Sequence, residues 1–264
     1  MPGEIMAPAS SLEDLSEIFR AGADAAYIGL KGYCRYEEAG VAPEEVPALI
    51  DFARKGGKKL YLAMNRVPKV GRENNFLDEL CRAVSRGIDG VILNDAGLIS
   101  EARKRNPDLF IMTSIGAAPL NTEEALFLKE LGTDRVLLPE GLAKEEIGEF
   151  SKIPDLKLEV FWQGLKDFTY TGKCYISSYF RQLPGGKGSA KRGGCFRVCE
   201  AGYDLAIDGK NLPVDISPEK FRFKGDPDPA IDSYKITGSR STGKELSEII
   251  IEAAAWAGGN PGGK

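Results

Sequence analysis

Histidine is missing from all 264 residues of this sequence. Its absence excludes Ser-His and Cys-His catalytic pairs, histidine general bases and every zinc site that needs an imidazole ligand. Any metal site must therefore use other ligands, and the five cysteines are the first side chains to consider.

Long apolar runs are also missing. No stretch approaches the roughly 20 apolar residues of a membrane span, and the first ten residues lack the basic region and apolar core of a signal peptide. We therefore expect a cytoplasmic protein without a membrane span. In a reducing compartment the cysteines are not expected to form structural disulfides, which leaves packing, metal binding or redox chemistry.

The charge balance gives little support for a general polyanion-binding surface. The formal net charge is -4 and the isoelectric point lies near 5.3, which argues against wholesale binding to nucleic acid or to a membrane surface. An apolar content of 42% is sufficient for a full core, and we expect one globular domain.

Short apolar runs alternate regularly with amphipathic stretches. Eight runs predict strands, and about seven amphipathic stretches between and after them predict helices. This alternation predicts right-handed βαβ units and a TIM-like (β/α)8 barrel. A dinucleotide-binding sheet has no support, because no GxGxxG follows the first strand. The predicted strands begin at residues 4, 25, 59, 90, 110, 135, 157 and 233.

The alternation of predicted strands and helices is interrupted once, after the seventh predicted strand. Residues 168–230 are rich in glycine, proline and charge, which predicts a long irregular excursion that bears cysteines. We therefore expect one barrel domain over residues 1–256 and a disordered tail over residues 257–264. Gly22, Gly56, Gly87 and Gly132 each follow a predicted helix, where a left-handed residue commonly ends it.

Four of the five cysteines follow predicted strands. Cys34 follows the second strand, Cys174 follows the seventh, and Cys195 and Cys199 lie farther along the same excursion. Loops that follow the strands of a parallel barrel emerge at one face, the face that carries active sites. The spacing of Cys195 and Cys199 would place both thiols on one side of a helical turn. These four cysteines are predicted to form a metal centre.

The fifth cysteine, Cys81, has an ordinary structural explanation. It belongs to an apolar stripe at helical spacing with Leu77, Leu80 and Val84, which predicts packing. The other four cysteines could bind zinc or an iron–sulfur cluster as thiolates. Ligation by sulfur alone does not distinguish zinc from an iron–sulfur cluster. Structural zinc sites usually use close pairs such as CxxC, and this sequence has none.

A basic segment surrounds three of the predicted ligands. Between Phe168 and Cys199 there are six basic residues and no acidic residue. Cations near an anionic thiolate cluster are favourable, and the same charges could bind an anionic substrate. Lys173, Arg192 and Arg197 are the predicted anion-binding residues. Asn65, Asn94 and Arg72 lie in or near loops that follow strands and are expected to line the same mouth.

Several segments resemble the collagenase-like peptidase family U-32. The resemblance is carried by EIMAPASSLEDLSEIFRAGADAAYIGLKGY, GVILNDAGLI, EVFWQGLKDFTYTGKCYISS and DSYKITGSR, and it spans nearly the whole chain. Cys174 matches the final cysteine of the family's signature segment. Gln163 and Asp167 stand where many members have histidine and a further cysteine. Cys34 and the late CxxxC are most like the UbiV-type branch of oxygen-independent ubiquinone hydroxylases, whose first cysteine comes early in the chain.

The resemblance implies a [4Fe-4S] cluster bound by Cys34, Cys174, Cys195 and Cys199, with zinc as the alternative metal. It also implies an oxygen-independent hydroxylase, or one subunit of a heteromer with a sister protein, that acts on an aromatic or quinone-precursor ring. The family's oxygen donor, the dicarboxylate prephenate, would suit the basic segment. Other members hydroxylate bases in ribosomal or transfer RNA.

Three alternatives remain beside the ring hydroxylase. An RNA base hydroxylase would use the aromatic residues of the excursion to stack a splayed base. A non-catalytic cluster carrier or electron-transfer partner would need the thiolates alone. A peptidase, which the family name records, is disfavoured because the sequence offers no histidine to activate a nucleophile.

Overall fold

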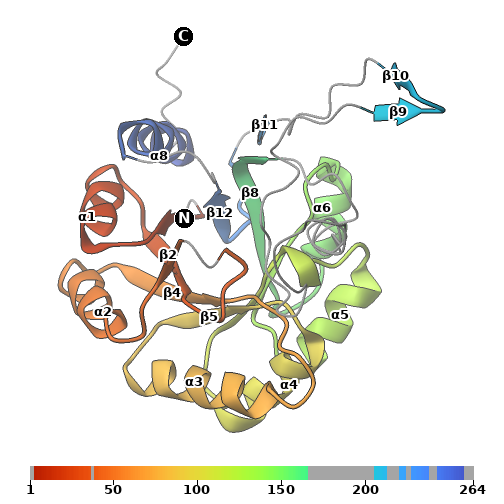
Figure 1. The fold of residues 1–264 in the computed structure, drawn as a ribbon. Coiled ribbons are helices and arrows are strands. Elements are labelled where there is room, and N and C mark those ends of the chain that lie inside the picture. Colours follow the sequence, from red (N-terminus) through yellow and green to blue (C-terminus); the bar gives the residue numbers. More distant parts are fainter. Residues whose placement is uncertain are drawn as a thin grey trace.

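The eight-stranded parallel barrel that the sequence predicts is present. The computed structural model describes residues 3–36, 39–165, 205–212, 220–223, 227–237 and 243–258. Eight parallel strands form a closed ring in the order β1-β12-β8-β7-β6-β5-β4-β2, and β1 pairs with β2 to complete it. Helices surround the ring on its outer side (Figure 1).

The described elements follow one another as strand and helix through most of the chain. The barrel strands are β1 (Glu4–Ala9), β2 (Ala25–Leu30), β4 (Lys59–Met64), β5 (Gly90–Leu93), β6 (Ile111–Thr113), β7 (Arg135–Leu137), β8 (Lys157–Leu165) and β12 (Ser233–Ile236). The helices are α1 (Leu12–Arg20), α2 (Val46–Lys55), α3 (Glu73–Ser85), α4 (Ala96–Arg105), α5 (Thr122–Glu130), α6 (Lys144–Phe150) and α8 (Gly243–Ala257). A short strand, β3 (Gly40–Val41), pairs with β2, and a 3-10 turn, η2 (Ile115–Ala117), follows β6.

The strands read as continuous apolar runs because both of their faces are buried. Side chains that point outward, such as Ile28 and Leu62, pack under the helices in the main core. Side chains that point inward form a second, smaller cluster that includes Met6 and Met112. The alternation along each strand therefore decides which residues line the interior of the barrel.

Of the four glycines predicted to end helices, three have the positive φ expected of a left-handed residue: Gly22, Gly87 and Gly132. At the amino-terminal ends, three of the described helices have side-chain caps. Ser11, Asp95 and Asn121 accept hydrogen bonds from the backbone of the first turns of α1, α4 and α5. The prediction of a left-handed Gly56 was wrong, because Gly56 has a φ of -81° and the next residue, Gly57, has the positive φ of 64°. Gly56 is the C-cap of α2 and stays right-handed, so the left-handed residue that follows the cap is Gly57.

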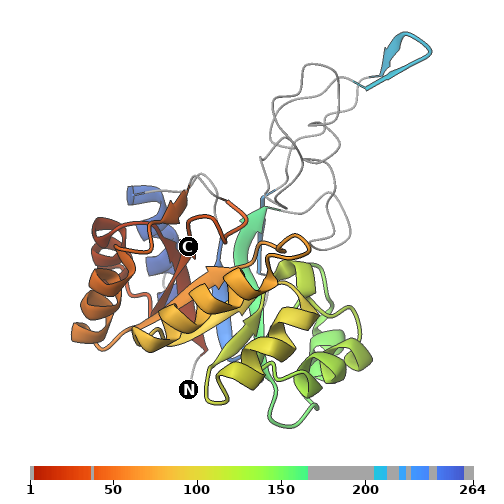
Figure 2. The same cartoon turned by 60° about the horizontal axis from the view of Figure 1, so that its bottom comes forward.

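Regular structure occurs within the predicted excursion. Strands β9 (Leu205–Ile207) and β10 (Lys210–Leu212) form an antiparallel hairpin, and β11 (Lys220–Arg222) pairs antiparallel with the end of β8. Figure 2 shows the hairpin standing away from the barrel. At the C-terminus α8 ends at Ala257, and residues 259–264 of the predicted tail lie outside the described residues.

A network of charged side chains fills the amino-terminal half of the barrel interior. Arg135 lies 3.0 Å from Glu4 and 3.7 Å from Glu159, and Lys235 lies 3.0 Å from Glu159. These side chains are almost completely buried, so each charge depends on its partners. The Arg135 guanidinium also lies over the rings of Tyr61 and Phe110.

Burial alone raises the pKa of the Glu4 carboxyl. The positive charge of Arg135 and a hydrogen bond from Lys59 act in the opposite direction and outweigh it, so the pKa of Glu4 lies below its ordinary value of 4.5. Burial also raises the pKa of Tyr27 and of Tyr61, and nearby carboxylates add to both effects. The two phenols therefore remain neutral over the physiological range.

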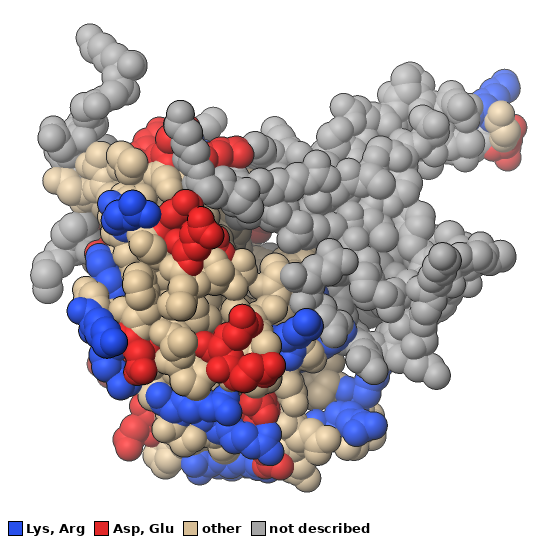
Figure 3. All heavy atoms as spheres, turned by 60° about the vertical axis from the view of Figure 1, so that its left-hand side comes forward, with Lys and Arg blue, Asp and Glu red and all other residues tan. Residues whose placement is uncertain are grey.

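On the face that carries α1 and α2, basic and acidic side chains are interspersed (Figure 3). Among the residues that the structure describes, no helix is long and apolar enough to cross a membrane.

Replacement of Arg135 by methionine should destabilise the protein by about 3–5 kcal/mol, because two carboxylates then remain buried with fewer positive partners. Urea denaturation measures the loss. The control is Lys152→Ala, which removes an exposed partner of Glu149 and should change the unfolding midpoint very little. Equal effects of the two substitutions would contradict the role given to the buried network.

The lowered pKa of Glu4 predicts a pH dependence of stability. The contribution of its charge is complete above the unfolded-state value of 4.5 and is lost as the pH falls through the lower folded-state pKa. The difference in stability between the wild type and Glu4→Gln should therefore be largest near pH 7 and should shrink at lower pH. Melting temperatures of both proteins between pH 7 and pH 3 test this, and a constant difference would exclude it.

Candidate active site at the carboxyl ends of the strands

Three neutral polar residues directly follow consecutive strands of the barrel. Asn65 follows β4, Asn94 follows β5 and Ser114 follows β6. Ala63, Ile92 and Met112, two residues earlier on the same strands, belong to the interior cluster, so alternation points the three polar side chains inward. We call Asn65, Asn94 and Ser114 the amide layer.

A hydrogen bond joins the outer members of the amide layer. The Asn65 Nδ2 donates to the Ser114 Oγ at 3.1 Å. Because β5 lies between β4 and β6, this bond passes over the end of β5, where Asn94 is placed. The three side chains therefore form one group at the mouth of the barrel.

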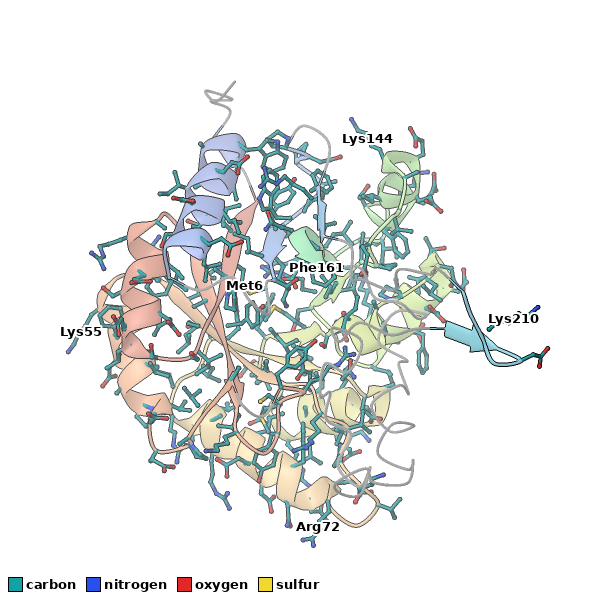
Figure 4. The ribbon with its side chains drawn as sticks, turned by 45° about the horizontal axis from the view of Figure 1, so that its top comes forward. Met6, Lys55, Arg72, Lys144, Phe161 and Lys210 are labelled. Atoms are coloured by element: carbon teal, nitrogen blue, oxygen red, sulfur yellow. The ribbon has the colours of Figure 1, made fainter. Side chains whose placement is uncertain are left out.

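An apolar shelf lies immediately below the amide layer. Its members are Ala63, Ile92 and Met112, none of which is more than 5% exposed. Figure 4 shows Met6 and Phe161 within the ring of strands as well. The shelf separates the amide layer from the buried charge network deeper in the barrel.

Cys34 lies at the same end of the barrel, in the turn after β2. Its side chain is buried, and its thiol donates to the carbonyl oxygen of Tyr36 at 3.2 Å. A Cβ atom built on Gly29 or on Gly40 would come within 3.0 Å of the sulfur. Gly29 shares the inward side of β2 with Ala25 and Tyr27, so the thiol lies on the inner side of the barrel wall.

The end of β4 holds the Cys34 turn in place. The Asn65 Oδ1 accepts from the backbone N–H of Arg35 at 2.8 Å. The backbone N–H of Arg66 donates to Tyr33, and the Arg66 guanidinium donates to the carbonyl oxygen of Gly32 at 3.1 Å. Asn65 therefore connects the cysteine turn to Ser114 across the mouth.

Of the predicted metal ligands the structure places Cys34. The other predicted site residues lie outside the described residues, and their meeting with Cys34 stays a prediction; they are Cys174, Cys195, Cys199, Lys173, Arg192 and Arg197. Within the described ranges, no group of three or more Cys, Asp or Glu side chains could hold a metal ion. A metal centre that includes Cys34 would therefore need further ligands from outside the described residues.

The remaining predictions for individual residues divide between the mouth and the periphery. Cys81 lies on α3, where it accepts from the Asn106 Nδ2 at 3.4 Å, and it takes no part in the mouth. Arg72 is exposed at the start of α3, and Figure 4 shows it at the outer edge of the molecule. The expectation that Arg72 lines the mouth was therefore wrong, whereas Asn65 and Asn94 do line it.

Sequence reasoning missed Ser114 and Arg66. Ser114 follows a predicted strand at the same parity as Asn65 and Asn94, so alternation could have identified it. Arg66 gave no signal, because its guanidinium bonds to a backbone carbonyl 34 residues away. Gly29 within a strand was a signal of close approach by another segment, which is Cys34 here.

A family model and known proteins match this barrel. The model of peptidase family U32 matches residues 10–241. The tRNA hydroxylation protein P of Escherichia coli is 31% identical over 213 residues, which cover 80% of this chain and 46% of that protein. The 23S rRNA 5-hydroxycytidine C2501 synthase of Escherichia coli is 27% identical over 78% of this chain and 30% of its own length. The chain spans about half the length of several curated relatives that it matches.

A solved structure shares the fold. The structure of the U32 peptidase Mk0906 superposes with a TM-score of 0.54 and 18% identity, and the match covers 62% of this chain and 70% of that one.

Replacement of Asn65 by alanine should loosen the Cys34 turn, because the Arg35 N–H loses its acceptor. Hydrogen exchange of the Arg35 amide should become roughly tenfold faster, as expected for the loss of about 1–2 kcal/mol of local stability. The matched control is Asn106→Ala, which removes an amide beside Cys81 and should leave exchange at Arg35 unchanged. Unchanged protection in Asn65→Ala would show that other contacts hold the turn.

Proposed function

The chain belongs to peptidase family U32, and on that premise we propose that it hydroxylates a base in RNA, alone or as part of a larger protein or complex. The observation that carries the proposal is the similarity to two proteins named for RNA hydroxylation, one for transfer RNA and one for ribosomal RNA. Each match covers more than three quarters of this chain, so it includes most of the barrel.

The geometry of the mouth supports a ring substrate. Neutral hydrogen-bonding groups lie directly above an apolar shelf at the end of the barrel where such folds carry their active sites. A base extruded from its strand needs both features, because its faces are apolar and its edge is polar.

We further propose that Cys34, Cys174, Cys195 and Cys199 hold a [4Fe-4S] cluster. Cys34 fits the role, because its buried thiol lies on the inner side of the barrel wall next to the amide layer. A bound cluster would supply one-electron redox chemistry at the mouth. Asn65 and Arg66 would hold the turn that carries its first ligand, and Lys173, Arg192 and Arg197 remain the proposed partners of an anion.

Hydroxylation of a quinone-precursor ring is the second candidate. The position of Cys34 supports it, because the UbiV-type branch takes its first ligand early in the chain. The names of the curated relatives favour RNA instead. A heteromeric partner and a purely electron-carrying role stay open as alternatives. We do not propose peptidase activity, because the sequence contains no histidine to activate a nucleophile.

The main proposal can be tested by expressing this chain in a bacterial host. The genes for the host's own RNA-hydroxylating relatives are deleted first. Mass spectrometry of nucleosides from total RNA should detect a nucleoside one oxygen atom heavier than its parent, and vector alone should give none. Formation of a hydroxylated quinone precursor with unmodified RNA would favour the second candidate and contradict RNA as the substrate.

Cysteine variants test the cluster separately from the activity. After anaerobic purification, iron and sulfide assays should give about four irons per chain. Cys34→Ser should lose the iron, whereas the matched control Cys81→Ser should keep it, because Cys81 lies on α3 beside Asn106. Stoichiometric zinc, or iron retained in Cys34→Ser, would refute the proposed ligand set.

A further inference from the structure

We propose that the amide layer is the site that reads the hydrogen-bonding edge of the base, with Asn94 as its principal contact. The inference rests on the proposed RNA substrate and adds the residues and the chemistry of its recognition. It assigns Asn94 and Ser114 to the substrate and Asn65 to holding Ser114 in position.

The first observation is the Asn94 amide oxygen. It is buried, and it has no hydrogen-bond partner among the side chains and backbone that the structure describes. Its neighbours Asn65 and Ser114 already bond to each other at 3.1 Å. A buried carbonyl group without a donor is unfavourable, so a site that keeps one is suited to a ligand that supplies the donor.

The second observation is the space that Gly116 provides. A Cβ atom on Gly116 would come within 2.1 Å of the Asn94 Oδ1 and 2.2 Å of the Nδ2. Gly116 belongs to η2 and is buried, and its backbone is not in the left-handed region, so no turn requires glycine there. The absence of a side chain at residue 116 lets the Asn94 amide occupy its place.

The third observation is the chemical character of the layer. Two amides and a hydroxyl carry no charge. The Asn65 amide is engaged at both ends, so the Asn94 amide and the Ser114 hydroxyl are the groups that offer acceptors beside donors. A pyrimidine or purine edge presents the same alternation of donors and acceptors. A carboxylate or phosphate would instead place negative charge against the Asn94 oxygen. The layer is therefore suited to a neutral heterocycle, and the anion of the sequence prediction would have to bind elsewhere.

The shelf completes the site. Ala63, Ile92 and Met112 lie directly below the polar side chains, and their side chains offer an apolar contact for the face of a ring. The charge network lies one layer deeper, where its ions are paired with one another. A ring seated on the shelf would therefore meet neutral groups at its edge and apolar groups at its face.

The test measures the binding of short RNA to the full chain by fluorescence anisotropy. The probes are ten-nucleotide oligomers of cytidine and of uridine, and an abasic ribose-phosphate oligomer of the same length. The difference in affinity between the base-bearing and abasic probes isolates base recognition from phosphate binding. Asn94→Ala removes the amide, and Gly116→Ala displaces it without changing its chemistry.

Both variants should lose the preference for base-bearing RNA by roughly tenfold or more, while binding of the abasic probe stays unchanged. The matched controls are Asn74→Ala, an amide that bonds to Arg105 on the surface, and Gly148→Ala, where a Cβ would meet nothing within 4 Å. Both controls should keep the wild-type preference. Melting temperatures establish that all four variants are folded.

Three outcomes would overturn the inference. If Asn94→Ala and Gly116→Ala keep the preference, the amide layer does not read the base, although the proposed RNA substrate stands. If wild-type protein binds base-bearing and abasic RNA equally, recognition does not involve the base. If wild-type protein binds neither and hydroxylates no RNA, the proposed function and this inference fail together.

Discussion

The pairing of β1 with both β2 and β12 closes the barrel, and the interior and the mouth depend on this closure. Met6 lies opposite Ala25 on one side and opposite Lys235 on the other, so the sheet has no open edge at this point. All eight strands are parallel, and their carboxyl ends therefore meet at one rim. An open sheet would expose Arg135 and Glu159 to water. It would also move the carboxyl end of β2 away from the ends of the strands on the other side of the ring.

Closure also divides the interior into layers of different character. Charged residues fill the amino-terminal half, where each is ion-paired with a neighbour, so the loss of any one of them would leave a buried charge without its partner. The apolar shelf separates these ions from the mouth, where the neutral Asn94 amide oxygen lacks a partner among the described residues. Polar groups that are paired are useful for stability, whereas those that lack a partner are useful for binding.

Glycines provide the close contacts at the mouth. Gly29 and Gly40 leave room for the Cys34 sulfur, and Gly116 leaves room for the Asn94 amide. In both places a side chain that matters to the proposed site occupies the space where a Cβ would otherwise be. The proposed cluster ligand and the proposed base contact therefore both depend on glycines that leave room for their side chains.

Much of the fold could be predicted, because strands and helices of a barrel follow local periodicity. All eight predicted strands are present, although β6 and β7 end earlier than their apolar runs; the chain after β6 turns into η2 at Ile115. The described part of the predicted excursion contains three short strands, which its glycine-rich composition did not indicate. Arg72 was misplaced because a helix start lies farther from the barrel axis than a strand end.

The sequence by itself determined the order of strands and helices, the absence of histidine chemistry and the position of Cys34 just after β2. The tertiary structure decided the contacts that give these residues a role. Asn65 and Ser114 are 49 residues apart, and Glu4 and Arg135 are 131 residues apart. Such contacts depend on the register and closure of the strands, which arise when the whole barrel assembles and are not encoded in any local pattern.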